Sequence, residues 1–285
     1  MDTRISRSAV LPLAVSVSLV LAGCRGPAER AGESIADRNA AARGGLEAWR
    51  RVHSLSMSGR LEAGKRRDPV QLATAWSRSP AQTRAQARRA LAHGRSEADG
   101  DQVQLPFTIE LKRPRKERVE VQFQGRAAVQ VFDGAHGWKV RPFLGRHEVE
   151  AFTAEEMRVA SQESDLDGLL IDHASKGCRV ALVGTEKVEG RDAYKLAVDC
   201  RRGVVRHVWV DPQTSLDVMV DGTRRIDGKI RPVWTLLRDY RAEKGLMMPH
   251  VLETRFEGAH GSETITVEKV AVNPSLDDSR FARPD

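Results

Sequence analysis

Several motifs that mark common enzyme classes are missing from this sequence. Its eight histidines are scattered, and none has the HExxH or a comparable ligand spacing, which argues against a metal site. No glycine-rich phosphate loop opens a helix after a strand, and no GxSxG elbow is present, so nucleotide chemistry and the usual serine-hydrolase layout lack support. The carboxylates Asp165 and Asp167, and the pair Asp277 and Asp278, stand at turn-like positions, where we interpret them as solvated. We expect a non-enzymatic protein without a metal or cofactor.

Long apolar runs are also missing. The apolar run at residues 9–22 is shorter than the ~20 residues of a spanning helix and is interrupted by Pro12, so we do not expect a permanent transmembrane anchor. Arg4 and Arg7 precede the run and small residues follow it, which is the order of an export signal. Residues 1–23 are therefore predicted to be a signal peptide that is cleaved.

The end of this segment resembles the lipobox of bacterial lipoproteins. Leu21, Ala22 and Gly23 precede Cys24, and the lipoprotein signal peptidase requires small residues before a cysteine that already carries diacylglycerol. The resemblance implies that Cys24 becomes the lipid-bearing first residue; an ordinary signal peptide with an accidental cysteine is the alternative. Arg25 follows instead of an aspartate, which in Gram-negative lipoproteins resembles the default for transfer to the outer membrane. We expect a lipid-anchored protein of the outer membrane that faces the periplasm.

Arginine dominates the charge of the chain. The formal net charge is +7, with arginine clusters at residues 60–95 and 112–118. An exported protein rarely meets nucleic acid, so we expect no nucleic-acid partner; anionic lipid head groups and plain solubility both remain as explanations. Residues 65–100 are rich in Arg, Ala, Gln and Ser with little periodicity, which predicts a long, flexible, basic excursion with partial helix around residues 81–91.

The first part of the exported chain is predicted to be helical. Residues 24–33 are interpreted as a short polar tether. Ser34 is a suitable N-cap for an amphipathic helix that extends to Val52. Gly44 and Gly45 are expected to weaken or bend this helix.

After residue 102 the sequence changes to a two-residue alternation of apolar and polar side chains, as in residues 107–112 and 119–124. This alternation is typical of half-buried strands. Similar segments, separated by turn signals at Glu189-Gly190, Asp211-Pro212, Asp221-Gly222 and Asp227-Gly228, recur at residues 180–183, 193–198, 204–210, 216–220, 233–240, 250–256 and 263–272. We predict about ten antiparallel strands.

One helical interlude interrupts the strands. Thr153 to Glu156 is a capping box that opens a helix, and residues 167–171 are predicted to continue as a second short helix. Alternation leaves one apolar face on the sheet, and this face must be covered. The fold class that we predict is therefore mainly β (α+β), with a single curved antiparallel sheet and helices over one face, in a domain that spans residues 34–285.

Cysteine is scarce, and Cys178 and Cys200 alone remain besides Cys24, without the CxxC spacing of redox motifs. A tight turn at Glu189-Gly190 would form a hairpin that places Cys178 opposite Cys200 or within about one residue of it. In an oxidising compartment a disulfide is then allowed, because a directly opposed pair can bring its Cα atoms within about 6.8 Å. A structural disulfide and two free buried thiols both remain open.

Three stretches together resemble the LolA/LolB-like superfamily of outer-membrane lipoprotein-sorting and related periplasmic proteins. They are AARGGLEAW at 41–49, VFDGAHGW at 131–138, and GTEKVEGRDAYKL at 184–196 followed by VWVD at 208–211. The resemblance extends over residues 35–285. It implies an unclosed, strongly curved antiparallel half-barrel whose apolar concave face is partly covered by helices and receives acyl chains. It implies no catalytic residues.

The leading functional hypothesis is a membrane-anchored periplasmic module that binds an acyl chain or another apolar ligand in a concave β-sheet pocket, in envelope lipid or lipoprotein handling. Burial of apolar area would drive binding. Trp138, Trp209 and Trp234 are the aromatic candidates for the pocket, with plain core packing as the alternative. The second hypothesis is a sensor or scaffold that binds another envelope protein through the same fold.

Overall fold

The alternating part of the chain folds into one antiparallel sheet. The computed structural model describes residues 26–63, 104–142, 146–200, 204–226, 229–257 and 262–284. Within these ranges the sheet has thirteen strands: β1 (Ser54–Ala63), β2 (Gln104–Lys112), β3 (Lys116–Phe123), β4 (Arg126–Phe132), β5 (Gly137–Arg141), β6 (Arg146–Ala151), β7 (Arg179–Val188), β8 (Arg191–Asp199), β9 (Val205–Val210), β10 (Asp217–Ile226), β11 (Lys229–Glu243), β12 (Leu246–Phe256) and β13 (Ser262–Val272). The helices are α1 (Pro27–Ala42), α2 (Leu46–Arg50), α5 (Ala154–Glu163) and the 3-10 helix η2 (Asp278–Phe281). We predicted about ten strands; the predicted segments do not include β1, β4, β5 and β6.

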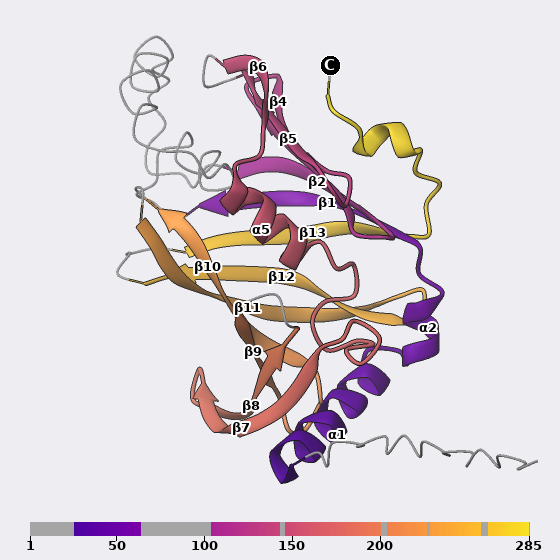
Figure 1. Cartoon of the computed structure of the whole chain (residues 1–285), viewed down its shortest axis with the longest axis vertical. Helices are drawn as coiled ribbons and strands as arrows, with labels where there is room; N and C mark the ends of the chain where they lie inside the picture. The colour runs from indigo at the N-terminus through magenta and orange to yellow at the C-terminus, as the bar shows by residue number, and fades with distance from the viewer. Residues whose placement is uncertain are drawn as a thin grey trace, which may run out of the picture.

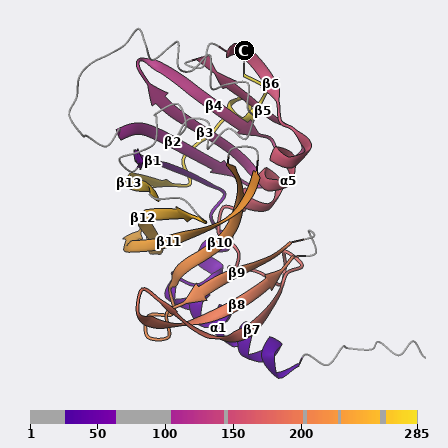
Figure 2. The ribbon, with the colours of Figure 1, turned by 90° about the vertical axis from the view of Figure 1, so that its left-hand side faces the viewer.

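The order of the strands explains the shape of the sheet. From one edge to the other the order is β6-β5-β4-β3-β2-β1-β13-β12-β11-β10-β9-β8-β7, and the first and last strands of the chain are neighbours in its middle. The edges, β6 and β7, do not pair with each other, so the sheet does not close. It bends strongly between these edges (Figure 1, Figure 2). The predicted unclosed half-barrel is confirmed.

Alternation gives the sheet an apolar inner face and a more polar outer face. In β2, Phe107 points inward and belongs to a core cluster with Leu61 and Val267. Glu110 points outward and accepts hydrogen bonds from Arg280 of η2 at 2.7 and 2.8 Å. The segment that contains η2 therefore packs on the outer face, which leaves the inner face to the other helices.

α1 covers the inner face at the β7 end of the sheet (Figure 1). Its buried side chains Ile35 and Ala36 join a core cluster that includes Val208 of β9. A Cβ atom at Gly32 would lie 2.7 Å from the Cα atom of Ala181, so only glycine allows this close approach between helix and strand. The apolar side of α1 thus covers the inner face of the sheet at its β7 end.

The start of α1 corrects the predicted boundary. The helix begins at Pro27 with Gly26 as its N-cap, and not after Ser34. Proline suits the first helical position because its missing N–H is not needed there. The prediction of a tether over residues 24–33 is therefore wrong from Pro27 onward. Among the helices of the described ranges, none combines the length and the apolar character that crossing a membrane requires.

Two glycines divide the predicted helix into α1 and α2. Gly44 and Gly45 have φ angles of 108° and 93°, which residues with a Cβ atom rarely adopt. The break turns the chain so that Trp49 of α2 is fully buried and its Nε1 donates to the carbonyl oxygen of Arg43 at 2.9 Å. The bend is thus a complete break that places Trp49 in the core.

A buried ion pair holds α5 over the inner face at β5. The predicted capping box is confirmed, since Glu156 N donates to Thr153 Oγ1 at 3.3 Å and Thr153 N donates to the Glu156 carboxylate at 2.8 Å. The same carboxylate binds Lys139 Nζ of β5 at 2.6 and 2.7 Å, and the two side chains are 6% and 2% exposed. Burial lowers the pKa of Lys139, and Glu156 opposes this shift.

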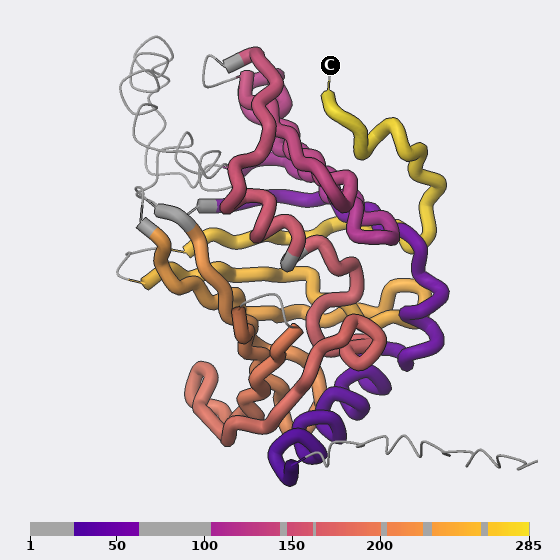
Figure 3. Tube along the Cα trace, in the orientation of Figure 1, coloured from indigo at the N-terminus to yellow at the C-terminus, as the bar shows by residue number. Residues whose placement is uncertain are grey.

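Residues 164–177 connect α5 to β7 across the inner face (Figure 3), and we call them the crossing segment. We predicted a short helix at residues 167–171, but this part of the chain forms turns, so that prediction is wrong. Leu166 and Ile171 enter the core cluster around Trp49, whereas Leu170 enters the cluster beneath α1. The turns allow all three side chains to be buried in these two clusters, which a regular helix would not allow, and this burial favours the turns over the helix.

Two predicted turns have different outcomes. The turn signal Asp211-Pro212 lies between β9 and β10 as expected. Asp221-Gly222 lies within β10, so the turn predicted there is wrong. Asp221 and Gly222 pair with β11, and the Asp221 carboxylate accepts a hydrogen bond from His207 N of β9 at 2.7 Å, which keeps this region extended. The turn predicted at residues 227–228 and the excursion at residues 65–100 lie outside the described residues.

A bulge in the β7–β8 hairpin brings the two remaining cysteines together. The hairpin turns at Glu189-Gly190 as predicted, and its pairing then shifts by one residue at Val183, which is 58% exposed. Beyond the shift the register places Cys178 opposite Cys200, and the two form a disulfide. Of the two alternatives that the sequence left open, this structure has the disulfide.

Replacing both Cys178 and Cys200 with alanine should lower the free energy of unfolding by about 3 kcal/mol, because the disulfide closes a loop with a sequence separation of 22. Urea unfolding of the oxidised wild type and of the double variant measures the difference. The wild type in excess reductant is the matched control and should behave like the variant. Equal stability of oxidised and reduced wild type would contradict a stabilising role.

Candidate functional site

A cavity of about 380 Å³ lies on the inner face of the sheet, between the strands and the crossing segment. Seven strands contribute to it: β1, β2 and β9 to β13. The volume lies within the range of ~300–1,000 Å³ that is usual for small-molecule sites. Most of its wall is aliphatic, formed by Met57, Ile109, Leu166, Leu169, Leu170, Val208, Val220, Val233, Leu237, Met248, Leu252, Ile265 and Val267.

The alternation of the long strands produces this aliphatic wall. In β11, Val233, Thr235 and Leu237 are two residues apart, so all three point inward into the cavity. The one hydroxyl among them is satisfied, because Thr235 Oγ1 and Thr254 Oγ1 of β12 are hydrogen-bonded at 3.0 Å. Apart from this pair of hydroxyls, this part of the wall therefore offers apolar contacts to a ligand.

Asp167 anchors the crossing segment over the cavity. Its side chain accepts a hydrogen bond from Arg113 Nη2 at 2.7 Å and pairs with Lys176 Nζ, and its carbonyl oxygen accepts from Arg43 Nη1 at 3.2 Å. We interpreted Asp167 as a solvated carboxylate at a turn, but it is only 1% exposed, so that interpretation is wrong. Arg43 and Arg113 from outside the segment, together with Lys176 within it, thus hold the segment in place.

The cavity wall also has a polar corner, formed by Arg43, Asp217 and Tyr240. Arg43 Nη1 lies 3.5 Å from Asp217 Oδ2, and Asn39 Nδ2 donates to Asp217 Oδ1 at 2.9 Å. Burial raises the pKa of Asp217, whereas Arg43 and Asn39 act in the opposite direction. Burial also raises the pKa of Tyr240, so its phenol is neutral over the physiological range.

Two further arginines in the wall already have partners. Arg224 Nη1 binds Glu263 Oε2 at 2.8 Å, and its guanidinium carbon lies 5.8 Å from the centre of the Phe256 ring. Arg206 Nε donates to the carbonyl oxygen of Asp221 at 2.7 Å. Within the part of the chain that the structure describes, no group of three His, Cys, Asp or Glu side chains could hold a metal ion.

The three tryptophans named from the sequence do not line this cavity. Trp209 and Trp234 are direct neighbours, along their strands, of Val208 and Val233, which point inward, so alternation places the tryptophans on the outer face. Trp138 neighbours the inward Lys139 in the same way. Their contact with a ligand therefore stays an untested prediction.

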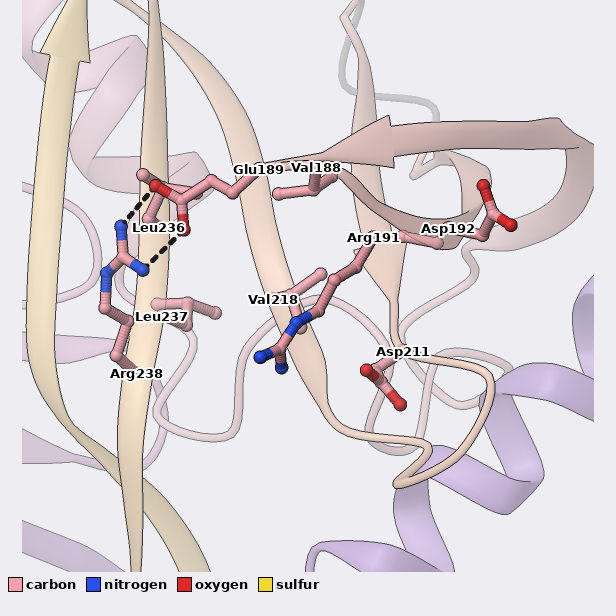
Figure 4. A pocket seen from close by; sticks show the side chains of 10 residues that line it. Val188, Glu189, Arg191, Asp192, Asp211, Val218, Leu236, Leu237 and Arg238 are labelled. Carbon is pink, nitrogen blue, oxygen red and sulfur yellow. Dashed lines mark hydrogen bonds and ion pairs between the residues drawn. The ribbon is translucent and has the colours of Figure 1, made fainter.

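A second depression of about 300 Å³ lies beneath the tip of the β7–β8 hairpin (Figure 4). Glu189 at the tip accepts a hydrogen bond from Arg238 of β11 at 2.7 Å and one from Arg255 of β12 at 2.9 Å. Asp192 and Asp211 also line the depression. Its charges are of mixed sign, and the Glu189 contacts tie the hairpin to the middle of the sheet.

The Glu189 carboxyl should remain ionised down to strongly acidic pH. Arg238 and Arg255 lower its pKa to about 2, so the contribution of this contact to stability is present above about pH 4.3 and is lost as the pH falls through about 2. A carboxyl-detected NMR titration measures the midpoint. Arg238→Gln, as a control, should move the midpoint upward, and a wild-type midpoint near the ordinary value of about 4.3 would contradict the contact.

The chain was compared with known proteins. No protein-family model matches the sequence, and no curated protein sequence matches it either. Solved structures do match its fold. An outer membrane lipoprotein-sorting protein domain from Vibrio parahaemolyticus is 14% identical, with a TM-score of 0.52 over 89% of this chain and 97% of that chain.

Two other solved structures show the same likeness. A LolA superfamily protein from Nitrosomonas europaea is 11% identical, with a TM-score of 0.53 over 88% of this chain and 97% of that chain. A DUF1329 family protein from Desulfovibrio piger is 14% identical, with a TM-score of 0.52 over 90% of this chain and 97% of that chain. The chain therefore has a LolA-like fold, as the sequence resemblance indicated.

Proposed function

We propose that this protein is a non-enzymatic, membrane-tethered module of the bacterial envelope that binds an acyl chain, or a ligand of similar apolar character, in the inner cavity. The observation that supports this proposal most strongly is the aliphatic wall of the cavity, which thirteen apolar side chains of the strands and the crossing segment form. Contact between water and an aliphatic wall of this kind is unfavourable in free energy. Replacing the water with hydrocarbon is therefore favourable.

The energetics favour a chain-like apolar ligand. At ~25 cal/mol per Å², burial of about 200 Å² of ligand surface contributes roughly 5 kcal/mol before the losses from ordering. The crossing segment, anchored by Asp167, supplies one side of the binding surface, and the seven strands supply the other. An acyl chain fits such a space because it needs no hydrogen-bonding partners along its length.

The location follows from the beginning of the sequence. Residues 1–23 and Cys24 lie outside the described residues, and we propose from their pattern that the signal peptide is removed and Cys24 is lipidated. Arg25 supports placement at the outer membrane, facing the periplasm. The name of the Vibrio parahaemolyticus domain refers to lipoprotein sorting, and the shared fold supports a role of this chain in envelope lipid or lipoprotein handling.

Copurified lipid tests the proposal directly. The chain with Cys24 replaced by serine, placed behind a signal peptide whose cleavage does not require lipidation, should be exported, purified without detergent, and extracted for mass spectrometry of bound lipid. We expect acyl lipid at close to one molecule per protein, and displacement of a fluorescent fatty acid in titrations. Absence of both bound lipid and fatty-acid affinity would refute the proposal and favour the alternative, a sensor or scaffold that binds another envelope protein.

A further inference from the structure

The polar corner of the cavity contains hydrogen-bonding groups that the fold does not satisfy. Arg43 is only 7% exposed, and while its Nη1 binds Asp167 and Asp217, its Nε has no partner among the described residues. The Tyr240 hydroxyl is buried and likewise lacks a partner within the described ranges. Both residues line the cavity. Two unpaired donors thus belong to residues that line the same cavity.

Such groups are rare in folded proteins because an unpaired buried donor loses its hydrogen bonds to water without replacement. Arg43 is also fixed in position, since its guanidinium lies 4.6 Å from the centre of the Trp49 ring and its Nη1 is held by Asp167 and Asp217. A donor that is rigid and unpaired is well suited to receive an acceptor atom from a ligand.

The local charge indicates what kind of acceptor fits. Arg43 already lies 3.5 Å from Asp217, so the buried pair is close to neutral. A ligand carboxylate would place a second negative charge beside Asp217, which is unfavourable at this degree of burial. A carbonyl oxygen can accept a hydrogen bond from Arg43 Nε or from the Tyr240 hydroxyl without adding charge. The corner therefore favours an uncharged acceptor.

We propose that the polar corner binds the carbonyl oxygen of an acyl ester, so that the ligand of the cavity is an esterified acyl chain and neither a free fatty acid nor a bare hydrocarbon. The acyl chain lies along the aliphatic wall, and the ester group lies at Arg43 and Tyr240. This inference rests on the proposed function, because it assigns the ligand class of the same cavity.

The test compares three probes of similar length: methyl dodecanoate, dodecanoate and tridecane. Each displaces the apolar dye N-phenyl-1-naphthylamine from the Cys24→Ser protein. The variant Tyr240→Phe removes one hydroxyl that has no hydrogen-bond partner among the described residues. Tyr194→Phe is the matched control, because the chain has two tyrosines and Tyr194 does not line the cavity.

We expect the wild type to bind methyl dodecanoate about tenfold more tightly than tridecane. Tyr240→Phe should lose most of this preference with unchanged affinity for tridecane, and Tyr194→Phe should keep it. Urea unfolding of both variants verifies that they fold. If the wild type prefers dodecanoate, or if Tyr240→Phe retains the ester preference because water occupies the corner, the inference is overturned. Failure of all three probes to bind the wild type would overturn the proposed function as well.

Discussion

Replacing Ile265 with tryptophan should weaken the binding of acyl ligands at least tenfold. Ile265 lies near the middle of the sheet, in β13, where it pairs with Leu61 of β1 and Leu252 of β12 and lines the cavity. An indole there occupies space that the ligand needs. If it displaces about 100 Å² of ligand contact, the loss is roughly 2.5 kcal/mol, which is more than tenfold in Kd. Displacement of N-phenyl-1-naphthylamine by methyl dodecanoate measures this change.

Thr266→Trp is the matched control for this variant. Thr266 is the next residue of β13, so its side chain points to the outer face and the same bulky group is added away from the cavity. Its affinity should stay within about twofold of the wild type. Equal affinities for all three proteins would mean that the ligand binds elsewhere, whereas equal losses for both variants would indicate a general disturbance of β13.

Replacing Lys139 with methionine should destabilise the fold by about 3–5 kcal/mol, because it leaves the Glu156 carboxylate buried without its cation. The lysine also joins α5 to the sheet, so its removal weakens the contact between the helix and β5. Urea unfolding followed by circular dichroism gives the free energy of unfolding of each variant. We expect a clear shift of the midpoint with an unchanged slope.

The double variant with Lys139→Met and Glu156→Leu distinguishes a lost ion pair from lost packing. Removing both charges avoids an unpaired carboxylate, so this variant should recover most of the stability that the single variant loses. The remaining deficit reflects the hydrogen bond from Thr153 N to Glu156 in the capping box. If the single and double variants are equally unstable, the unpaired charge is not the cause of the destabilisation.

The strands and their apolar face were predictable because that information is local. In β11, β12 and β13 the two-residue alternation spans enough residues to identify both the strand and its buried side. The resemblance to the LolA/LolB-like superfamily then supplied the curvature and the open edges, which alternation alone does not specify. The capping box at Thr153 was equally local and was confirmed.

Two features escaped prediction because a neighbouring strand decides the structure there. Asp221-Gly222 is a strong turn signal, yet pairing with β11 and the hydrogen bond from His207 N of β9 to Asp221 hold it extended. The bulge at Val183 was also beyond the sequence pattern, although it determines that Cys178 lies in register with Cys200. Both features depend on how separate strands pair, and the local strand propensity of a segment does not determine this pairing.

The candidate site was predictable in kind but not in detail. An aliphatic concave wall was expected, whereas the polar corner was not, since Arg43 and Tyr240 are far apart in sequence and line one cavity only in the fold. One signal was present: Asn39 and Arg43 are four residues apart and share the face of α1 that buries Ile35. Polar residues within a buried helical stripe could have indicated a buried polar cluster.

A crystal structure of the Cys24→Ser protein with methyl hexadecanoate tests the central claim most directly. We predict continuous electron density for the acyl chain between the crossing segment and strands β10 to β13, in contact with Leu237 and Ile265. Density for the ligand only on the outer face, or an inner cavity closed by Leu166 and Leu170 with the ligand excluded, would contradict the claim that the inner face of the sheet is a binding site.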